Sequence, residues 1–465
     1  MALRFKNGYS RQVEEFKPID KGKVRMYTCG PTVYLFAHIG NFRTFIFEDL
    51  LRRYLKYKGY QVTQVMNITD IDDKIIRDSQ KEGKALKEFT EPYTKAFFED
   101  IDTLGIERVE HYPHATDYIK QMVEIVKKLV DNGLAYEVDG NYYFKISAFK
   151  DYGKLAHLDM EGLKPGARVA SDEYEKESVS DFALWKAWDE KDGDIFWETD
   201  IGKGRPGWHL ECSAMSMEIL GEHFDIHTGG VDNMFPHHEN EIAQSEGATG
   251  QKFVNYWLHS EYLIVEGKKM SKSLGNYYTL RDVLEKGYSG KAVRYILMAT
   301  HYRQQLNFTF EGLDAARNSL ERYNDFIANL ASYQGGESDG SASEIIEKAK
   351  SEFENALDDD LNISAALAAV FDLIRDINRS KAENKLSAEE RDSALELVAR
   401  FDTVLNFRTE SGGSLDEQVE ALIEERNQAR AGKDFATSDK IRDQLLEMGI
   451  ILEDTPQGVR WKKKV

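Results

Sequence analysis

Cysteine is scarce in this chain, which has only Cys29 and Cys212 among its 465 residues. A disulfide scaffold is thereby excluded, and two lone thiols in a reducing compartment are expected to be core, catalytic or metal-binding groups. Long apolar runs are also absent: no stretch of about eighteen apolar residues occurs, so the sequence predicts no membrane span. The opening "MALRFKNGYSRQVEEFKP" has no apolar segment after its basic residues, so we expect no signal peptide and a cytoplasmic protein.

Basic residues are outnumbered, since 61 Lys and Arg stand against 81 Asp and Glu and give a net charge of −20. Indiscriminate binding to nucleic acid is therefore not expected, although a local basic patch can still contact phosphates. Hydrophobic residues make up 41% of the chain and aromatic residues 11%, which is enough to build folded cores. The length fits about three or four domains of ordinary size.

The region around Cys29 has the pattern of a parallel α/β unit. Residues 24–28 predict a short strand that ends at Gly30, and the apolar spacing in "HIGNFRTFIFEDLLRRYLKYKGY" predicts a helix. The segment "QVTQVMNIT" follows as a second strand. Strand, helix and strand in this order build an open parallel sheet, whose ligands bind at the carboxyl ends of the strands. Cys29 is expected at that edge.

The first residues of this predicted helix indicate an anion site. A helix N-terminus attracts a phosphate, and Gly40 allows a ligand to approach closely. His38 can donate a hydrogen bond to a phosphoryl oxygen as charge develops, and Asn41 completes the string "HIGN". The alternative is that His38 only caps the helix.

A polar loop with three lysines, Lys268, Lys269 and Lys272, lies in "VEGKKMSKSLGNYYTL", residues 265–280. A mobile loop of this composition can bring ammonium groups onto a triphosphate and stabilise a departing pyrophosphate. A solvated basic loop is the alternative interpretation. The joint presence of "HIGN" and "KMSKS" in one α/β chain is highly specific, and it resembles the two signature sequences of class I aminoacyl-tRNA synthetases.

Further segments narrow this resemblance to cysteinyl-tRNA synthetase. The strings "CGPTVY", "NITDIDDKI", "GRPGWHLECSAM", "FDIHTGGVD" and "FPHHENEIAQSE" match that family in order and spacing over essentially the whole chain. The resemblance implies an enzyme that forms cysteinyl-adenylate from L-cysteine and ATP, and then transfers cysteine to its tRNA. Mg²⁺ is expected to arrive with the ATP. Phe42 and Thr228 depart from the family pattern, which has a small residue and a glycine there.

The resemblance also assigns roles to individual residues. The implied catalytic residues are His38, Asn41, Lys269 and Lys272. ATP is implied to contact Gly40, His38, Lys272 and Asp232. The implied substrate-binding residues are Thr69, Trp208, His209 and His227. The alternative for Trp208 and the two histidines is an ordinary buried position. We interpret the acids of "TDIDDKI" as capping and structural residues.

The segment "FPHHENEIAQSE" is either a solvated helix face or half of a metal site. Pro236 suits a first helical turn, after which His237 and Glu241 share one face while His238 points elsewhere. An imidazole and a carboxylate one turn apart can supply half of a tetrahedral site. By family resemblance, one Zn²⁺ per chain is bound by Cys29, Cys212, His237 and Glu241. The only two cysteines of the chain fall at these positions.

Zinc gives such an enzyme a way to select its substrate. Cysteine and serine differ by one atom, and a shaped pocket discriminates such near-isosteres poorly. Zinc prefers thiolate and lowers the pKa of a thiol, whereas a serine hydroxyl is far harder to deprotonate. A separate editing domain is therefore not expected.

The expected fold is α/β, with a Rossmann-like parallel-sheet catalytic domain, an inserted connective domain, a helical bundle and a small C-terminal domain. A hairpin is predicted at Asp139-Gly140, a buried helix stripe begins at Ile363, and a capping box begins at Ser387. The predicted boundaries are 1–115 and 206–285 for the two catalytic halves, 116–205 for the insertion, 286–410 for a tRNA-binding bundle, and 411–465 for an anticodon-recognition domain.

We expect a monomer whose partners are L-cysteine, ATP and the tRNA for cysteine, with no membrane partner. The tail "GVRWKKKV" is expected to contact tRNA, Trp461 by stacking and its basic neighbours through phosphates. Two alternatives remain. A related ligase that joins activated cysteine to an amino sugar shares the zinc set but lacks the domain at residues 411–465. A non-catalytic zinc and nucleic-acid binding protein has no use for both signature strings.

Overall fold

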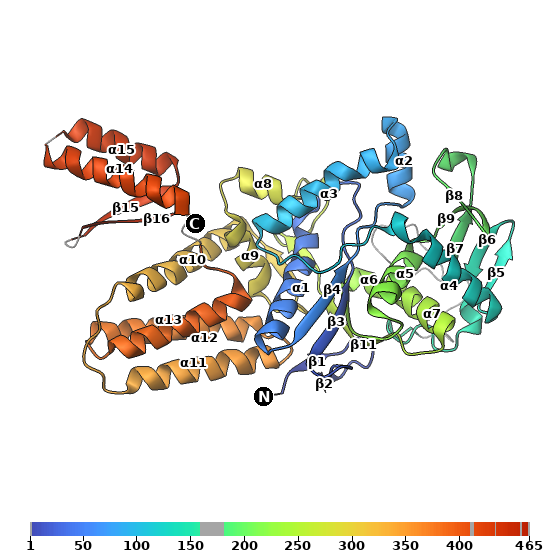
Figure 1. The fold of residues 1–465 in the computed structure, drawn as a ribbon, viewed down its shortest axis with the longest axis horizontal. Helices are drawn as coiled ribbons and strands as arrows, with labels where there is room; N and C mark the ends of the chain where they lie inside the picture. Colours follow the sequence, from blue (N-terminus) through green and yellow to red (C-terminus); the bar gives the residue numbers. More distant parts are fainter. Residues whose placement is uncertain (1, 159–180, 410–412, 433, 456–457, 464–465) are drawn as a thin grey trace.

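The computed structural model describes residues 2–158, 181–409, 413–432, 434–455 and 458–463. A parallel sheet lies near the middle of the molecule, with a second sheet on one side and a group of long helices on the other (Figure 1). A small unit formed by the last elements lies at the same end of the molecule as the long helices, above them in Figure 1. Within the described residues, no helix combines the length and the apolar character needed to cross a membrane.

The central sheet has four parallel strands in the order β11-β10-β3-β4. Their bounds are Lys23–Thr28 for β3, Gln61–Met66 for β4, Phe224–Gly230 for β10 and Val254–Ser260 for β11. Helix α1, Ile39–Tyr57, connects β3 to β4, so the predicted strand–helix–strand unit is confirmed. Because all four strands run the same way, their carboxyl ends share one edge of the sheet.

Both faces of this sheet are buried. Met26 and Met66 contribute to the core that includes α1, whereas Tyr27 and Val65 contribute to a second core on the opposite face. The second core includes α4 (Ile119–Asp131), α5 (Trp208–Leu220) and α7 (Glu239–Thr249). The sheet is therefore covered on both sides, as is usual for parallel sheets.

An antiparallel sheet occupies the chain between the two parts of the central sheet. Its order is β5-β6-β7-β9-β8. The bounds are Ala135–Val138 for β5, Asn141–Phe144 for β6, Phe182–Ala187 for β7, Trp197–Thr199 for β8 and Gly202–Pro206 for β9. Asp139 and Gly140 join β5 to β6 with φ values of 49° and 80°. The predicted two-residue hairpin is confirmed, and its positive φ values explain the Asp-Gly pair.

The chain after the central sheet is mainly helical. The helices are α8 (Leu280–Glu285), α9 (Gly290–Ala299), α10 (Phe310–Ala331), α11 (Ser341–Asp358), α12 (Ile363–Ala382) and α13 (Ala388–Leu405). The predicted stripe on α12 is buried, and Ser387 and Glu390 form the predicted capping box of α13. The earlier α2 (Asp73–Glu82) is capped by Asp72, as expected for a structural acid.

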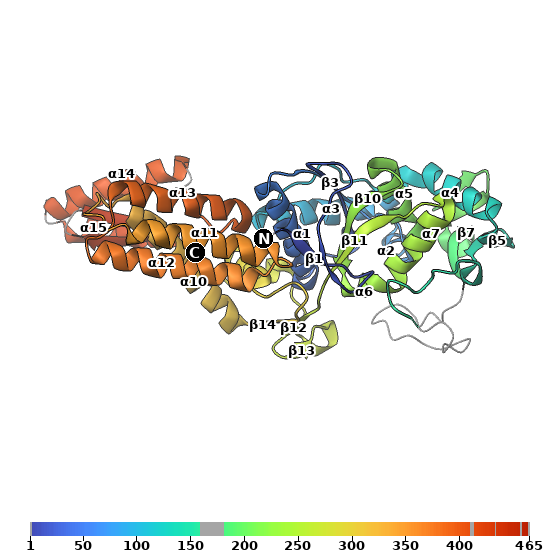
Figure 2. The same cartoon turned by 90° about the horizontal axis from the view of Figure 1, so that it is seen from below.

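Several further elements complete the structure. They are β1 (Arg4–Lys6), β2 (Val13–Glu15), α3 (Leu86–Thr103), α6 (Val231–Asn233), β12 (Leu263–Val265), β13 (Lys268–Lys269) and β14 (Leu306–Phe308). The small sheet β13-β12-β14 lies at the lower edge of the view in Figure 2. The last unit contains α14 (Gly413–Ala431), α15 (Phe435–Glu447), β15 (Ile450–Thr455) and β16 (Gly458–Lys463). The tail side chains Arg460, Trp461, Lys462, Lys463 and Lys464 lie outside the described residues or side chains.

A buried ion pair joins the central sheet to the helices that follow it. Arg294 on α9 lies 2.6 Å from the carboxylate of Asp49 on α1, and both side chains are fully buried. Burial raises the pKa of Asp49, but Arg294 and Arg53 outweigh it and hold that pKa below its usual range. The carboxylate is therefore ionised and paired, which fixes α1 against α9.

Candidate metal and nucleotide site

The carboxyl edge of the central sheet gathers most of the predicted site residues. Cys29 directly follows β3, and its N–H donates to the carbonyl of Thr228 in β10 at 3.3 Å. His227 lies within β10, which continues to Gly230. Cys212 is placed by α5, which packs against β3 and β4. Residues from both halves of the chain therefore meet at one edge.

The histidine-rich segment is less regular than the sequence predicts. Regular helix α7 begins only at Glu239, and it is preceded by a wide turn, η4 (Met234–His238), in which Phe235 has extended φ and ψ angles. The helical backbone that continues into α7 therefore resumes at Pro236, and the prediction that Pro236 lies in a first helical turn is confirmed. The expected contact between His237 and Glu241 is present, because Nε2 of His237 lies 3.0 Å from Oε1 of Glu241.

The four residues predicted to hold zinc lie together. One potential ligand atom from each of Cys29, Cys212, His237 and Glu241 lies within 4.8 Å of those of the other three, and all four residues are buried. This clustering excludes a solvated helix face for His237 and Glu241.

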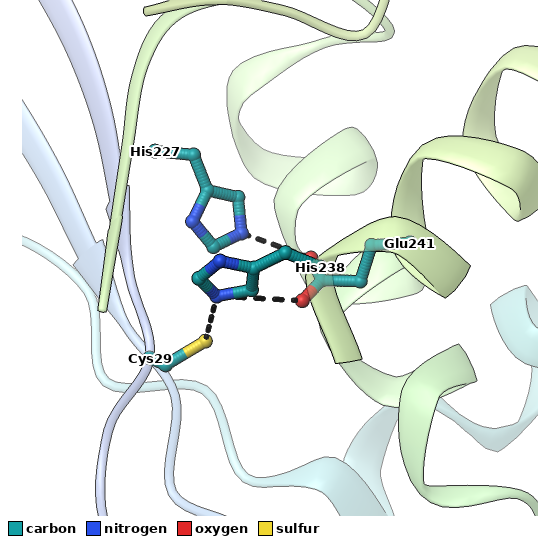
Figure 3. Close-up of side chains that lie close together, drawn as sticks. All are labelled: Cys29, His227, His238 and Glu241. Atoms are coloured by element: carbon teal, nitrogen blue, oxygen red, sulfur yellow. Dashed lines mark hydrogen bonds and ion pairs between the residues drawn. The ribbon is translucent and has the colours of Figure 1, made fainter. Parts of the chain in front are cut away.

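A second, overlapping set has the same property. It consists of Cys29, His227, His238 and Glu241 (Figure 3). Nε2 of His238 lies 3.2 Å from Sγ of Cys29 and 4.0 Å from Oε1 of Glu241. The prediction that His238 points elsewhere is wrong, because residues three apart also share a helix face and the imidazole is buried against Trp257 of β11.

Electrostatic contacts keep Glu241 ionised. Burial raises its pKa, but His227 and His237 outweigh this effect and lower it to about 2. Oε2 of Glu241 lies 2.9 Å from Nε2 of His227. Oε1 is buried and has no hydrogen-bond partner, although His237 lies nearby. A buried carboxylate oxygen that makes no hydrogen bond in this structure is available as a ligand for a cation.

The thiol chemistry of the cluster also fits a metal. Burial raises the pKa of Cys212, but hydrogen bonds with Cys29 and His237 lower it to about 6. Burial and the neighbouring Cys212 hold the pKa of Cys29 well above its usual value. Two sulfurs, one imidazole and one carboxylate form a donor set that suits tetrahedral Zn²⁺. The residues present therefore fit a zinc ion.

Neighbouring aromatic groups orient His237. Trp208 stacks on its ring, with centroids 4.3 Å apart. Nδ1 of His209 lies 2.9 Å from Nδ1 of His237, and burial lowers the pKa of His209 well below its usual value. A neutral His209 can take part in a single N–H···N hydrogen bond that leaves Nε2 of His237 directed at the cluster.

His38 forms the other end of the site, at the start of α1. Nδ1 of His38 accepts a hydrogen bond from the N–H of Asn41 at 3.1 Å, and the Asn41 side chain accepts from the N–H of His38. Burial, with a smaller effect of Lys272, lowers the pKa of His38 to about 4. The imidazole is therefore neutral at pH 7 and carries its proton on Nε2, as a donor. His38 caps the helix and keeps a donor available.

The lysine loop lies against this helix start. Lys269 ends β13, and Lys272 begins a short turn, η5 (Lys272–Leu274), which Ser271 caps. Nζ of Lys272 lies 5.1 Å from the centre of the Tyr277 ring. The same ring meets His38 edge to face at 5.3 Å. The structure therefore brings Lys272 and His38 to one aromatic ring.

Thr69, a predicted substrate residue, and Asp232, a predicted ATP contact, follow the strands β4 and β10. Thr69 donates to Oε2 of Glu211 at 3.2 Å and accepts from Asn67, so its side chain joins neither the metal cluster nor His38. Asp232 lies in α6, immediately after β10. Sequence reasoning missed His259, whose Nε2 lies 2.8 Å from Nδ1 of His238. Its place near the carboxyl end of a buried strand was an available signal.

Family models match three parts of the chain. The model for the catalytic domain of class I (C) tRNA synthetases matches residues 15–318. A DALR domain model matches residues 352–407, and a model for the anticodon binding domain of cysteinyl-tRNA ligase matches residues 413–461.

Full-length relatives are similar across the whole chain. A cysteine–tRNA ligase of Protochlamydia amoebophila is 53% identical, covering 99% of this chain and 98% of that protein. A cysteine–tRNA ligase of Solibacter usitatus is 52% identical, covering 100% of each. Among solved structures, a methionyl-tRNA synthetase of Mycobacterium tuberculosis has a TM-score of 0.61 at 16% identity, covering 83% of this chain and 90% of that chain. That likeness supports the fold. The chain belongs to the cysteine–tRNA ligase family of class I aminoacyl-tRNA synthetases and is an aminoacyl-tRNA ligase.

Proposed function

We propose that this enzyme activates L-cysteine with ATP and transfers the cysteinyl group to the tRNA for cysteine. The observation that carries the proposal is the buried meeting of Cys29, Cys212, His237 and Glu241 at the carboxyl edge of the sheet. An open parallel sheet keeps its ligands at this edge. Family membership supplies the reaction class, and the cluster supplies the reason for choosing a thiol substrate.

These four residues are proposed to bind one Zn²⁺ per chain. When bound, the ion would supply a soft Lewis acid that lowers the pKa of the substrate thiol and favours sulfur over the hydroxyl of serine. The chain's own residues prepare the position: Glu241 is ionised, and Trp208 and His209 restrain the His237 ring. Discrimination then depends on the donor set, so an editing domain is unnecessary.

The nucleotide is proposed to bind at the start of α1. The helix N-terminus and the Nε2–H of neutral His38 are directed to phosphoryl oxygens, while Asn41 fixes the tautomer of His38. Lys272, with Lys269, neutralises the departing pyrophosphate, and Mg²⁺ accompanies the ATP. Gly40 permits close approach. Asp232, Thr69 and His227 are proposed to meet the ribose and the amino acid.

The remaining parts are proposed to bind tRNA. On this proposal residues 1–115 and 206–285 form the catalytic domain, 116–205 form the connective insertion, 286–410 form the tRNA-binding bundle and 411–465 read the anticodon. The match of residues 413–461 to an anticodon-binding model supports the last assignment. We further propose that the enzyme acts as a cytoplasmic monomer.

Two assays test the function. Purified protein with ATP and labelled pyrophosphate should exchange label into ATP when cysteine is added, and serine at the same concentration should support far less exchange. Charging should then occur with purified tRNA for cysteine. Equal exchange with serine would contradict the role proposed for the cluster, and exchange without tRNA charging would favour the amino-sugar ligase.

A further inference from the structure

Tyr277 lies between the two signature strings and contacts a residue of each. Its ring meets the ring of His38 edge to face, with centroids 5.3 Å apart and an angle of 82° between the planes. Nζ of Lys272 lies over the same ring, 5.1 Å from its centre. Among the described residues, no carboxylate forms an ion pair with Lys272. The contact with Tyr277 is therefore the interaction that locates its ammonium group.

Hydrogen bonds made by its neighbours on both sides fix where Tyr277 lies. On the near side, Asn276 accepts from the N–H of Ser271 at 2.9 Å and donates to the carbonyl of Lys269 at 3.1 Å. These bonds tie the residue before Tyr277 to the lysine loop.

On the far side, the carbonyl of Tyr278 accepts from the N–H of Ile39 at 3.0 Å, and His38 pairs with Thr279 as an isolated bridge. Thr279 also caps α8 through a reciprocal pair with Asp282. The residues after Tyr277 are thus tied to the start of α1. Tyr277 is held where the loop and the helix start meet.

Both ring contacts are attractive and of useful size. A cation over a partly exposed aromatic ring gains about 0.5–1 kcal/mol, and an edge-to-face ring pair gains about 0.5–1.5 kcal/mol. The Lys272 side chain is exposed and long, so it would otherwise sample many rotamers. Restricting it beforehand lowers the entropy lost when its ammonium must meet a phosphate.

We propose that Tyr277 is a positioning residue for ATP-dependent activation, whose ring holds Lys272 and His38 at the same side of the nucleotide site before ATP binds. This inference rests on the proposed function. Tyr277 acts through Lys272 and His38 and need not touch the substrate. The proposed role depends on the aromatic ring and not on the hydroxyl. Phenylalanine at position 277 should therefore preserve this role, and an aliphatic side chain should not.

The kinetic test compares Tyr277→Phe with Tyr277→Leu in cysteine-dependent pyrophosphate exchange. The Leu variant should lose about tenfold in kcat with KM for cysteine unchanged, whereas the Phe variant should stay within about twofold of the original enzyme. In a Lys272→Ala background the same Leu substitution should lower kcat less than about threefold, because the ammonium group that the ring holds is already absent. An equal loss in both backgrounds would overturn the proposal.

A second measurement does not depend on activity. Without ATP, the rate at which an amine-reactive acylating reagent modifies Lys272 is followed by mass spectrometry, with the exposed Lys252 as reference. Tyr277→Leu should raise the relative rate about threefold and Tyr277→Phe should leave it unchanged. Identical labelling rates in the Phe and Leu variants would contradict the proposal that the ring of residue 277 holds Lys272. A complete lack of cysteine-dependent exchange in the unsubstituted enzyme would instead contradict the proposed function, and the labelling result would still decide the role of the ring.

Discussion

The hydroxyl of Thr228 donates a 2.8 Å hydrogen bond to Oε1 of Glu48, and both side chains are fully buried. Burial raises the pKa of Glu48 to about 8, against a smaller lowering by Thr228. The pair links α1 to β10 next to His227.

This pair predicts a pH-dependent stability. The pKa of Glu48 rises from 4.5 in the unfolded chain to about 8 in the fold, so the folded state holds an extra proton between these values. The resulting stability is fully present below about pH 4.5 and is lost as the pH rises through about 8, by up to about 5 kcal/mol. Glu48→Gln mimics the protonated acid. The melting temperature of this variant, relative to that of the original enzyme, should therefore rise as the pH increases from 6 to 9. Calorimetry checks this, with the exposed Glu347→Gln as control. Parallel curves for both variants would contradict the shift.

Gly40→Ala should impair activation. A Cβ at residue 40 would lie 2.9 Å from the ring of His38 and 3.3 Å from the terminal methyl of Met270. The imidazole would have to move from the position set by Asn41, so we expect about a tenfold or larger loss in the rate of pyrophosphate exchange. Gly432→Ala meets only ordinary contacts and should leave exchange unchanged. Full activity of Gly40→Ala would show that the His38 ring is not held in this position.

Lys272→Ala should slow adenylate formation by orders of magnitude and leave cysteine binding nearly intact. The lysine is proposed to act on the leaving phosphates, so its loss removes transition-state stabilisation. Pre-steady-state exchange and calorimetric titration with cysteine separate the two effects, and Lys252→Ala is a matched surface control. Damage confined to cysteine affinity would exclude the proposed role.

Removal of residues 411–465 should separate activation from charging. Activation needs the central sheet, the metal cluster and the lysine loop, so cysteine-dependent exchange should persist in a truncated protein that remains folded. Charging at subsaturating tRNA should collapse through loss of tRNA affinity, and the salt dependence of tRNA binding should flatten. Charging at the full-length rate would show that these residues do not read tRNA.

The local elements of the fold could be predicted from the sequence. The β3–α1–β4 unit follows from apolar spacing and from Gly30 and Gly59 at its ends, and the Asp139-Gly140 turn and the Ser387 cap are short-range signals. Strand order could not be predicted in this way. β10 lies between β3 and β11 although nearly two hundred residues separate it from β3, and no local periodicity encodes that neighbour.

The site residues also divide into those that local sequence spacing predicts and those that depend on tertiary contacts. The spacing of His237 and Glu241 predicted their contact, because four residues make about one helical turn. His238 was assigned to the wrong side, because a spacing of three residues also places it on the face of Glu241 and because its packing against Trp257 is a tertiary effect. His259, Glu48 and Tyr277 were missed because each acquires its role from a residue on another element. Single-residue patterns do not contain that information.

The zinc content of two neighbouring histidine variants tests the central claim most directly. His237→Gln and His238→Gln change adjacent buried residues that belong to different candidate sets. After dialysis against a weak chelator, zinc is measured by elemental analysis, with Cys212→Ser alongside. The account predicts one zinc per chain in the unsubstituted enzyme and in His238→Gln, and a loss of most zinc in His237→Gln and Cys212→Ser. Zinc retained by His237→Gln and Cys212→Ser but lost from His238→Gln would contradict it and move the ion to the set of Cys29, His227, His238 and Glu241.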